Sequence, residues 1–551
     1  MAALIALPIG SATADEPLTQ AAARIQGDRI AAHVRVLASD AYEGRAPGTH
    51  GETLTLDYVT AAFRDAGLRP AFPNGYLQAV PMLELEPSGS RAFTVASSVG
   101  PVPLVETEDY VARFGSPKAT VRFGASPIVF VGYGVSAPER GRDDYAAMNL
   151  SGKTVVLLQA NPPDSNPKHL PSPSSKLSER LEAAARHGAR AAIVVHTAAS
   201  LGYPWSVLSG GGLGSKEYFL APEPGKHPLD AVVYLSEPAA RRLFSVGALD
   251  FDKEQRRAAE PAFHPVSTSL TATLAESAVV HRIESHNVIG LVPGNSSAAE
   301  CLILMAHWDH MGRDPALKGD QIFNGAVDNA TGVGTVIEIG RALRSLPASP
   351  RRTIVLVATT GEERGLLGSE YLTRHPVCPL RGTVGAIAID ALFPFGLWNR
   401  MTVTGFGSSE LEEALAVASQ LYGRKLQDDG APQAGAFFRA DNYPFVKRGV
   451  PGFLAVGGPD NATPETDPQV KALTDYVQNK YHHPTDEYDA KTWDMRGIEG
   501  DARILFRFAW AVANDPRIPN WYWDSPYRPI ADSLRRSNSA SRARPDRTRE
   551  H

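Results

Sequence analysis

Histidine and carboxylate residues stand at the ends of several apolar runs in the second half of the sequence. Imidazole nitrogen and carboxylate oxygen without cysteine thiolate favour zinc, with manganese or cobalt as weaker candidates. One carboxylate offers two oxygens and can bridge two divalent ions about 3.5–4 Å apart, so five such ligands suffice for a two-metal site. The pattern therefore predicts a centre for two adjacent metal ions. Its candidate ligands lie in the segments 307–310, 325–329, 362–363, 390 and 481–486.

The apolar runs that carry these residues predict the elements that position them. The runs 302–306, 354–359 and 384–389 alternate with helical patterns at 332–346 and 365–373. Runs that are apolar throughout and bounded by helices indicate an α/β sheet covered on both faces. Such sheets place their chemistry at strand ends. Each candidate taken singly also has an ordinary interpretation, such as a helix cap, and the prediction depends on their joint placement.

The first half of the chain has a different texture. A helical pattern at 53–66 is followed, from about 118 to 272, by short β-rich runs such as 127–133 and 154–159. We therefore expect a catalytic domain in two parts, 24–117 and 276–516, that is interrupted by a β-rich insertion at 118–272.

Composition excludes several classes of protein. The chain has 551 residues, 21% of them charged, with 55 basic and 60 acidic side chains, which is typical of a globular protein. A formal net charge of −5 indicates no broad basic surface for nucleic acid. The sequence contains no stretch of about 18 apolar residues, so no membrane span is predicted. Cys301 and Cys378 permit one disulfide or none.

Both ends of the chain have distinctive compositions. Residues 1–14 are small and apolar and end in Ala12-Thr13-Ala14, which resembles the remnant of a signal peptide with its cleavage site. This segment predicts export, so we expect a secreted or periplasmic protein. Residues 533–551 are rich in serine and arginine and predict a disordered basic tail.

Several motifs resemble the two-zinc peptidase family that contains secreted bacterial aminopeptidases and glutamate-carboxypeptidase-type enzymes. They are His307-x-Asp309, Asp328, Glu362-Glu363, Asp390, Tyr481-His482-x-Pro484-x-Asp486, the segment 37–52 and the stretch 438–445. The resemblance implies a mixed, mostly parallel central sheet sandwiched by helices. It also implies that the β-rich insertion is a protease-associated domain, which acts as a lid or substrate gate.

The resemblance implies a role for each matched residue. His307 and Asp390 would hold one Zn²⁺, Glu363 and His482 the other, and Asp328 would bridge the two. Glu362 would be the general base. Asp309 would fix the ring of His307 from behind. The family also implies a cis peptide after the bridging aspartate.

The stretch around Arg439 contains the candidate substrate-binding residues and departs from the family pattern at two positions. Arg439, Asp441 and Tyr443 are candidates for substrate binding. Family members often carry a histidine at the position of Asn442, and a tyrosine just upstream, where this chain has phenylalanines. The residue that stabilises the oxyanion is therefore left open, with Tyr443 as one candidate.

The function predicted from these motifs is a zinc-dependent exopeptidase with a peptide substrate, foremost an aminopeptidase. A carboxypeptidase of the same fold would need a cation for the substrate carboxylate, and Arg439 is the candidate. Glutaminyl cyclisation uses one zinc, so the presence of both His307 and Asp390 argues against it. A non-catalytic receptor module would be expected to lose ligands or the base. The sequence indicates neither side-chain preference nor oligomeric state.

Overall fold

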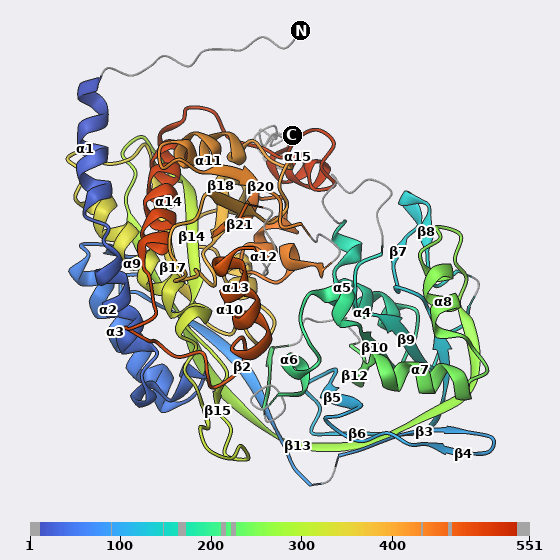
Figure 1. Ribbon diagram of the computed structural model, residues 1–551. Helices are drawn as coiled ribbons and strands as arrows, with labels where there is room; N and C mark the ends of the chain where they lie inside the picture. The colour runs from blue at the N-terminus through green and yellow to red at the C-terminus, as the bar shows by residue number, and fades with distance from the viewer. Residues whose placement is uncertain are drawn as a thin grey trace, which may run out of the picture.

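The computed structural model describes residues 12–89, 91–146, 148–162, 172–210, 216–221, 228–430, 434–460 and 466–536. They form two lobes that lie side by side and are spanned underneath by one long strand pair (Figure 1). Each lobe has a hydrophobic core of its own. The larger lobe, here called the catalytic lobe, contains both ends of the described chain. The smaller lobe is called the insertion.

The catalytic lobe is built on a mixed sheet with a parallel centre. Its central strands run parallel in the order β17, β14, β18, β21, and β13 joins β17 antiparallel at one side. This arrangement confirms the predicted α/β fold with a mostly parallel central sheet. The strands are β14 (Ser297–His307), β17 (Arg352–Thr359), β18 (Thr383–Ala388) and β21 (Gly452–Gly458).

Side-chain alternation along β14 explains why helices cover both faces of this sheet. Leu302 and Leu304 pack into the core on one face, whereas Ile303 and Met305 pack into the core on the other. Successive strand residues point to opposite faces, so an all-apolar strand must be covered twice. The first face carries α2 (Gly27–Leu37), α3 (His50–Asp65), α9 (Thr331–Arg344) and α14 (Arg496–Asn514), and the second carries α10 (Leu367–Arg374) and α12 (Tyr443–Val446).

The insertion has a sheet of its own, in which β6, β9, β10 and β12 are parallel neighbours. Helices pack on it, so the lobe is α/β rather than mainly β. Its hydrophobic core begins at Leu85 and ends at Ala278, and thus extends beyond both ends of the predicted span 118–272. The elements are β6 (Thr120–Phe130), β9 (Thr154–Leu158), β10 (Ala191–His196), β12 (Ala231–Ser236), α4 (Leu177–Arg186), α7 (Glu237–Val246) and α8 (Phe251–Ala258).

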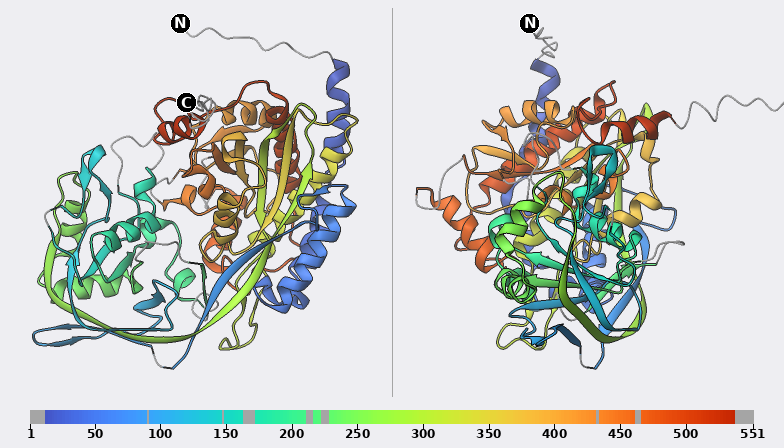
Figure 2. Two further views of the ribbon diagram at one scale, coloured as in Figure 1. Left: turned by 180° about the vertical axis from the view of Figure 1, so that it is seen from behind. Right: turned by 90° about the vertical axis from the view of Figure 1, so that its right-hand side faces the viewer.

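One long strand connects the lobes. β13 (Val266–Val292) is 27 residues long and pairs with β6 in the insertion and with β17 in the catalytic lobe. Between these regions it pairs antiparallel with β2 (Leu77–Pro87). Figure 2 shows this ribbon sweeping beneath both lobes. The chain therefore enters and leaves the insertion along a single two-stranded ribbon.

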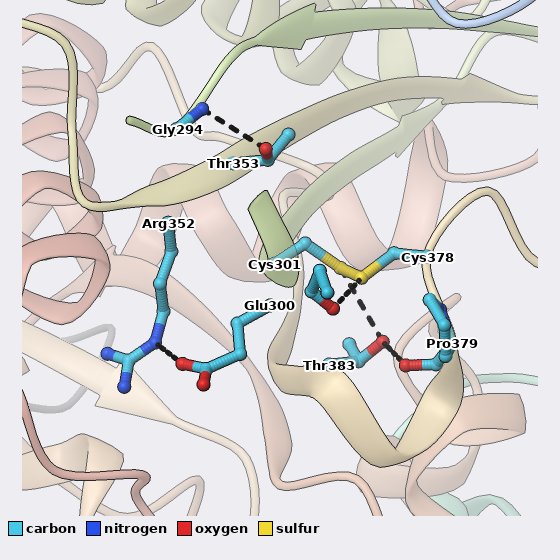
Figure 3. The surroundings of a disulfide bond; sticks show 9 residues. Gly294, Glu300, Cys301, Arg352, Thr353, Cys378, Pro379 and Thr383 are labelled. Atoms are coloured by element: carbon cyan, nitrogen blue, oxygen red, sulfur yellow. Dashed lines mark hydrogen bonds and ion pairs between the residues drawn. A yellow bond between two sulfur atoms is a disulfide. The ribbon is translucent and has the colours of Figure 1, made fainter. Parts of the chain in front are cut away.

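A disulfide joins Cys301 at the beginning of β14 to Cys378 in the segment before β18 (Figure 3). The two Cα atoms lie 6.4 Å apart. Next to it, Arg352 forms an ion pair with Glu300, with 2.7 Å between Nε and Oε2. Of the two possibilities left open by the sequence, the structure has the bridge.

The ends of the chain differ partly from expectation. Residues 1–11 of the predicted signal remnant lie outside the described residues, and Ala12–Ala23 form helix α1. The predicted disordered tail was wrong for residues 533–536, which complete helix α15 (Arg528–Arg536), because Leu534 packs on the catalytic lobe. Residues 537–551 lie outside the described residues. In the described part of the chain, every helix is too short or too polar to cross a membrane.

Candidate metal centre

The predicted ligands meet at the carboxyl edge of the parallel strands. His307 is the last residue of β14, Glu363 follows β17, and Asp390 follows β18. Parallel strands end at the same edge of a sheet, so these three side chains converge. Asp328 comes from the turn before α9, and His482 from the segment after α13 (Pro468–Asn479).

The distances divide these five residues into two groups that share Asp328. Oδ1 of Asp328 lies 3.2 Å from Nε2 of His307, and Oδ2 lies 3.3 Å from Nε2 of His482. On the first side, Asp390 Oδ1 lies 3.2 Å from the same His307 nitrogen. On the second side, Glu363 Oε2 lies 3.1 Å from the same His482 nitrogen. One carboxylate thus presents one oxygen to each group.

The electrostatics of this cluster favour bound cations. Burial acts to lower the pKa of His482, but Glu363 and Asp328 outweigh it and raise that pKa to about 10. The pKa of His307 is likewise raised well above its usual value, because Asp390 and other carboxylates outweigh burial. The carboxylates therefore attract positive charge into a buried site. An all-nitrogen and oxygen donor set with this excess of carboxylate fits divalent zinc, as the sequence predicts.

The candidate base is also in place. Glu362 follows β17 directly before Glu363 and lines the pocket next to the cluster. Burial raises the pKa of Glu362 well above its usual value, and nearby carboxylates add to this effect. A carboxyl group with a raised pKa is suited to accept and return a proton near neutral pH.

Asp309 acts differently from the expectation. Its carboxylate lies 4.0 Å from Nδ1 of His307, whereas its backbone carbonyl oxygen lies only 3.0 Å from that nitrogen. The carboxylate instead accepts a hydrogen bond from the backbone N–H of Glu362, at 3.1 Å. The ring of His307 is therefore oriented by the main chain, and the side chain of Asp309 positions the base.

Three supporting residues had no assigned role in the sequence analysis. His310 Nδ1 lies 2.7 Å from Oε1 of Glu363 and orients that carboxylate. Asp486 accepts hydrogen bonds from the backbone N–H groups of Val327 and Asp328.

Arg45 is buried and donates to four backbone carbonyls, those of Leu37, Trp308, Asn324 and Gly325. Arg45 therefore joins the loop after β14 to the loop that carries Asp328. In the sequence, the only sign of this role for Arg45 was its place in the segment 37–52, which resembles the family.

The cis peptide that the family resemblance implies is present between Asp328 and Asn329.

Of the adjacent residues His482 and His483, the one that the motif predicts as the ligand is the one that faces the cluster. His482 faces the cluster, whereas the partly exposed His483 makes no ion pair with it among the described residues.

A pocket of about 300 Å³ adjoins the cluster. Asp328, Glu362, Glu363 and Asp390 lie at its acidic end. The remaining wall is mainly apolar, and part of it comes from the insertion. The insertion supplies Leu201, Gly202 and Tyr203, and the catalytic lobe supplies Phe393, Arg439, Leu454, Val456, Tyr476 and Tyr481 among others.

Two of the three predicted substrate-binding residues lie elsewhere. Asp441 is buried and accepts hydrogen bonds from the hydroxyls of Thr359 and Ser369, so it ties the end of β17 to α10. Tyr443 is fully buried against Phe438, and Lys176 of the insertion lies over its ring. Neither lines this pocket, because both are buried in the interior of the protein. Tyr481, which belongs to the Tyr481-His482-x-Pro484-x-Asp486 motif but had no expected role, lines the pocket instead.

The fold is an α/β sheet, and two histidines and several carboxylates meet at the carboxyl edge of its parallel strands. This arrangement is typical of a metal-dependent enzyme. Residues 287–502 match the model described as Peptidase family M28. The matched segment includes every predicted ligand, from His307 to His482.

Curated relatives match short parts of the chain. Aminopeptidase YwaD of Bacillus subtilis is 33% identical over 92 residues, 16% of this chain and 18% of the relative. A probable zinc metalloprotease of Pyrenophora tritici-repentis is 33% identical over 88 residues, 16% of this chain and 18% of the relative. The matched stretches thus span about a fifth of the length of these relatives.

The solved structure of an aminopeptidase from Aneurinibacillus sp. strain AM-1 resembles the whole architecture. It covers 91% of this chain and 97% of its own, with a TM-score of 0.51 and 18% sequence identity. At this identity the likeness concerns the fold.

Proposed function

We propose that this protein is a zinc-dependent exopeptidase, and specifically an aminopeptidase that releases N-terminal residues from peptides. The observation that carries the proposal is the position of Asp328, whose two oxygens each face one histidine–carboxylate pair. The match to the peptidase family M28 model and the name of the relative YwaD support the same activity.

Two zinc ions are proposed as the cofactors, with manganese or cobalt as substitutes. His307 and Asp390 would hold one ion, Glu363 and His482 the other, and Asp328 both. Bound there, a pair of divalent cations supplies a polarised substrate carbonyl and an activated water.

The side chains around this centre would move the protons. Glu362 would accept the proton of the attacking water on its carboxylate and later pass it to the leaving amine. The hydrogen bond from its own N–H to Asp309 holds the backbone of the base in place. Because Asp309 is fully buried, this support does not depend on solvent.

Tyr481 is the candidate for stabilising the charge that develops on the carbonyl oxygen. Its ring lies 3.9 Å from that of His482, centroid to centroid, and it lines the pocket. Burial, together with Asp328 and Glu363, raises the pKa of Tyr481 well above its usual value. The phenol therefore keeps its proton and can donate a hydrogen bond to a developing oxyanion. Replacing Tyr481 with phenylalanine tests this role.

A carboxypeptidase of the same fold is the second candidate function. The observation that favours it is Arg439, which lies in the pocket and could pair with a substrate carboxylate. The two candidates differ in which end of the peptide must be free.

A panel of free and blocked peptides separates them. The purified, zinc-loaded protein is assayed on leucyl-anilide, on a tripeptide and on the N-acetylated form of the same tripeptide. An aminopeptidase hydrolyses the first two and leaves the acetylated peptide intact. Hydrolysis of both tripeptides, with leucyl-anilide left intact, would establish the carboxypeptidase instead. Hydrolysis that persists in excess chelator would refute the metal mechanism.

Two further predictions belong to this proposal. We propose a secreted or periplasmic location, which the Cys301–Cys378 disulfide supports because such bridges persist in oxidising compartments. We also propose that the insertion is a protease-associated domain that restricts access to the pocket, which its contribution to the pocket wall supports. Mass determination of the mature N-terminus after expression in an exporting host tests the first of these.

A further inference from the structure

Arg439 is a cation without a fixed anionic partner inside the pocket. Its guanidinium carbon lies 5.2 Å from the centre of the Tyr203 ring, and its side chain is exposed. Among the described residues, no carboxylate lies within ion-pair distance of Arg439. The guanidinium also hydrogen-bonds to the Tyr203 hydroxyl, and the rest of its five N–H donors are available for a planar anion.

The pocket gives this cation a distinctive position. The other charged groups that line it, in the described part of the chain, are the carboxylates at its metal-binding end. The rest of the wall is neutral and largely apolar. An anionic substrate group that enters the pocket therefore has one protein side chain of opposite charge to pair with, and that side chain is Arg439.

The insertion holds the stacking partner in place. Gln159, which follows β9, donates a hydrogen bond from Nε2 to the hydroxyl of Tyr203 at 2.9 Å. Its Oε1 lies 3.0 Å from Nδ1 of His196 at the end of β10. Burial lowers the pKa of His196 to about 4, so this support is uncharged at neutral pH. Tyr203 is thus connected to two strand ends of the insertion core.

The size of the pocket limits what reaches Arg439. About 300 Å³ is the lower end of the range for ligand pockets, about 300–1,000 Å³. One extended residue adds at most about 3.6 Å to a chain. Because Arg439 lines the same pocket as the metal-binding carboxylates, the first carboxylate that a substrate can bring to it is one on the residue that directly follows the scissile bond, where a longer peptide has a neutral amide.

We propose that Arg439, oriented by Tyr203 of the insertion, binds a carboxylate on the residue that follows the scissile bond, which makes short peptides, and dipeptides above all, the favoured substrates. This inference rests on the proposed aminopeptidase function. The anion is either the terminal carboxylate of a dipeptide or an acidic side chain at the same residue, and both would form the same bidentate pair.

Three substrates distinguish these sources in the zinc-loaded protein. They are Leu-Ala, Leu-Ala amide and Leu-Glu amide, compared by kcat/KM. We expect Leu-Ala to exceed Leu-Ala amide by about tenfold or more, as for a charge-assisted hydrogen bond. A similar gain for Leu-Glu amide over Leu-Ala amide would show that an acidic side chain is also bound. Equal values for all three substrates would overturn the proposal.

Variants locate the effect. In Arg439→Gln we expect the ratio of Leu-Ala to Leu-Ala amide to fall to about one, whatever the residual turnover. Tyr203→Ala should lower the ratio through KM, and Tyr203→Phe should retain it because the ring remains. Arg186→Gln, at an exposed arginine of the insertion, is the matched control and should keep the wild-type ratio. An unchanged ratio in Arg439→Gln contradicts the proposal.

The leucyl-anilide assay separates this inference from the one it rests on. If the wild-type protein hydrolyses leucyl-anilide but treats acid and amide alike, carboxylate binding is wrong and the aminopeptidase function stands. If no leucyl substrate is hydrolysed at all, the proposed function itself is wrong.

Discussion

The two sides of the substrate pocket are built in different ways. On the metal-binding side, His307, Glu363 and Asp390 follow the ends of core strands, and a hydrogen bond with His310 orients Glu363. On the other side, the insertion supplies Leu201 at the end of α5 (Ala198–Leu201) and Tyr203, whose hydroxyl is hydrogen-bonded to Gln159 and to Arg439. The difference suggests that the core determines the reaction and the insertion determines which substrates reach it. Substitutions on the two sides should therefore have separable effects.

The strongest test of the metal-binding side is Glu362→Gln. The amide cannot take a proton, so we expect a loss of about 10²–10⁴ in kcat. Both metal ions should be retained, because Glu362 is not a proposed ligand, and elemental analysis of the purified variant checks this. Wild-type turnover in a metal-replete Glu362→Gln variant would place the base elsewhere.

Adjacent histidines give a matched pair for the ligand assignment. His482→Ala should lose one of the two bound metal ions and at least about 10-fold to 100-fold of activity, as for a disrupted metal site. His483→Ala should keep both ions and nearly full activity, since His483 makes no ion pair with the cluster in the described structure. If the two variants behave alike, the register of the motif is misassigned.

The disulfide tests whether the far end of a ligand-bearing strand matters for stability. Cys301 begins β14, which ends at His307, and the bridge closes a loop with a sequence separation of 77. Replacing both cysteines with alanine should lower the free energy of unfolding by about 2–5 kcal/mol. Urea unfolding followed by circular dichroism measures this, with the reduced wild-type protein as a control. Equal midpoints for oxidised and reduced protein would contradict the expectation.

Leu201→Ala tests the insertion side of the pocket. Leu201 is buried and lines the pocket, so truncation removes apolar contact from a bound substrate. We expect kcat/KM for leucyl-anilide to fall about tenfold relative to alanyl-anilide, in line with about 1–3 kcal/mol for lost apolar contacts. Metal content should not change. A uniform loss on both substrates would mean that this wall also supports the reaction itself.

The smallest expected effect concerns Glu338 on α9, the helix that begins just after Asp328. Burial acts to raise the pKa of Glu338, but His33, Arg29 and Arg341 outweigh it and lower that pKa to about 2. Because the folded value lies below the unfolded value of about 4.3, the ionised group stabilises the fold above about pH 4.3. This contribution is lost as the pH falls toward 2.

Glu338→Gln should therefore lower stability by about 1–2 kcal/mol at pH 7 and by less at pH 3. Urea unfolding of chelator-treated protein at the two pH values measures the difference. Glu413→Gln, at an exposed glutamate of α11 (Leu411–Gln420), serves as the control. A deficit that is the same at pH 3 as at pH 7 would show that the charge of Glu338 is not its cause.

The central sheet of the catalytic lobe could be predicted from the sequence, whereas the extent of the insertion could not. Apolar runs that lead into His307 and Asp390 were enough to predict an α/β sheet covered on both faces, since a strand buried on both faces has no polar alternation, and the family resemblance added that the sheet is mostly parallel. The catalytic lobe of the structure confirms that fold. The extent of the insertion was less accessible, because β3 (Ala92–Ser97) looks like any short strand until it pairs with the distant β13.

The residues that line the pocket could be predicted only in part from the sequence. Arg439, Asp441 and Tyr443 are neighbours in the sequence, yet only Arg439 faces the pocket. Local spacing does not reveal that Thr359 and Ser369 engage Asp441, or that Phe438 and Lys176 cover Tyr443. For the same reason, the orientation of His307 by a backbone carbonyl rather than by the Asp309 side chain was not predicted.

The sequence by itself determined the chemistry of the centre, because residue types restrict a site to nitrogen and oxygen ligands and strand ends restrict where they can meet. The tertiary structure alone decided the orientation of His307 by a backbone carbonyl and the contribution of Tyr203 to the pocket. Tyr203 and Arg439 lie far apart in the chain, and such contacts depend on how two lobes pack, which local sequence patterns do not encode.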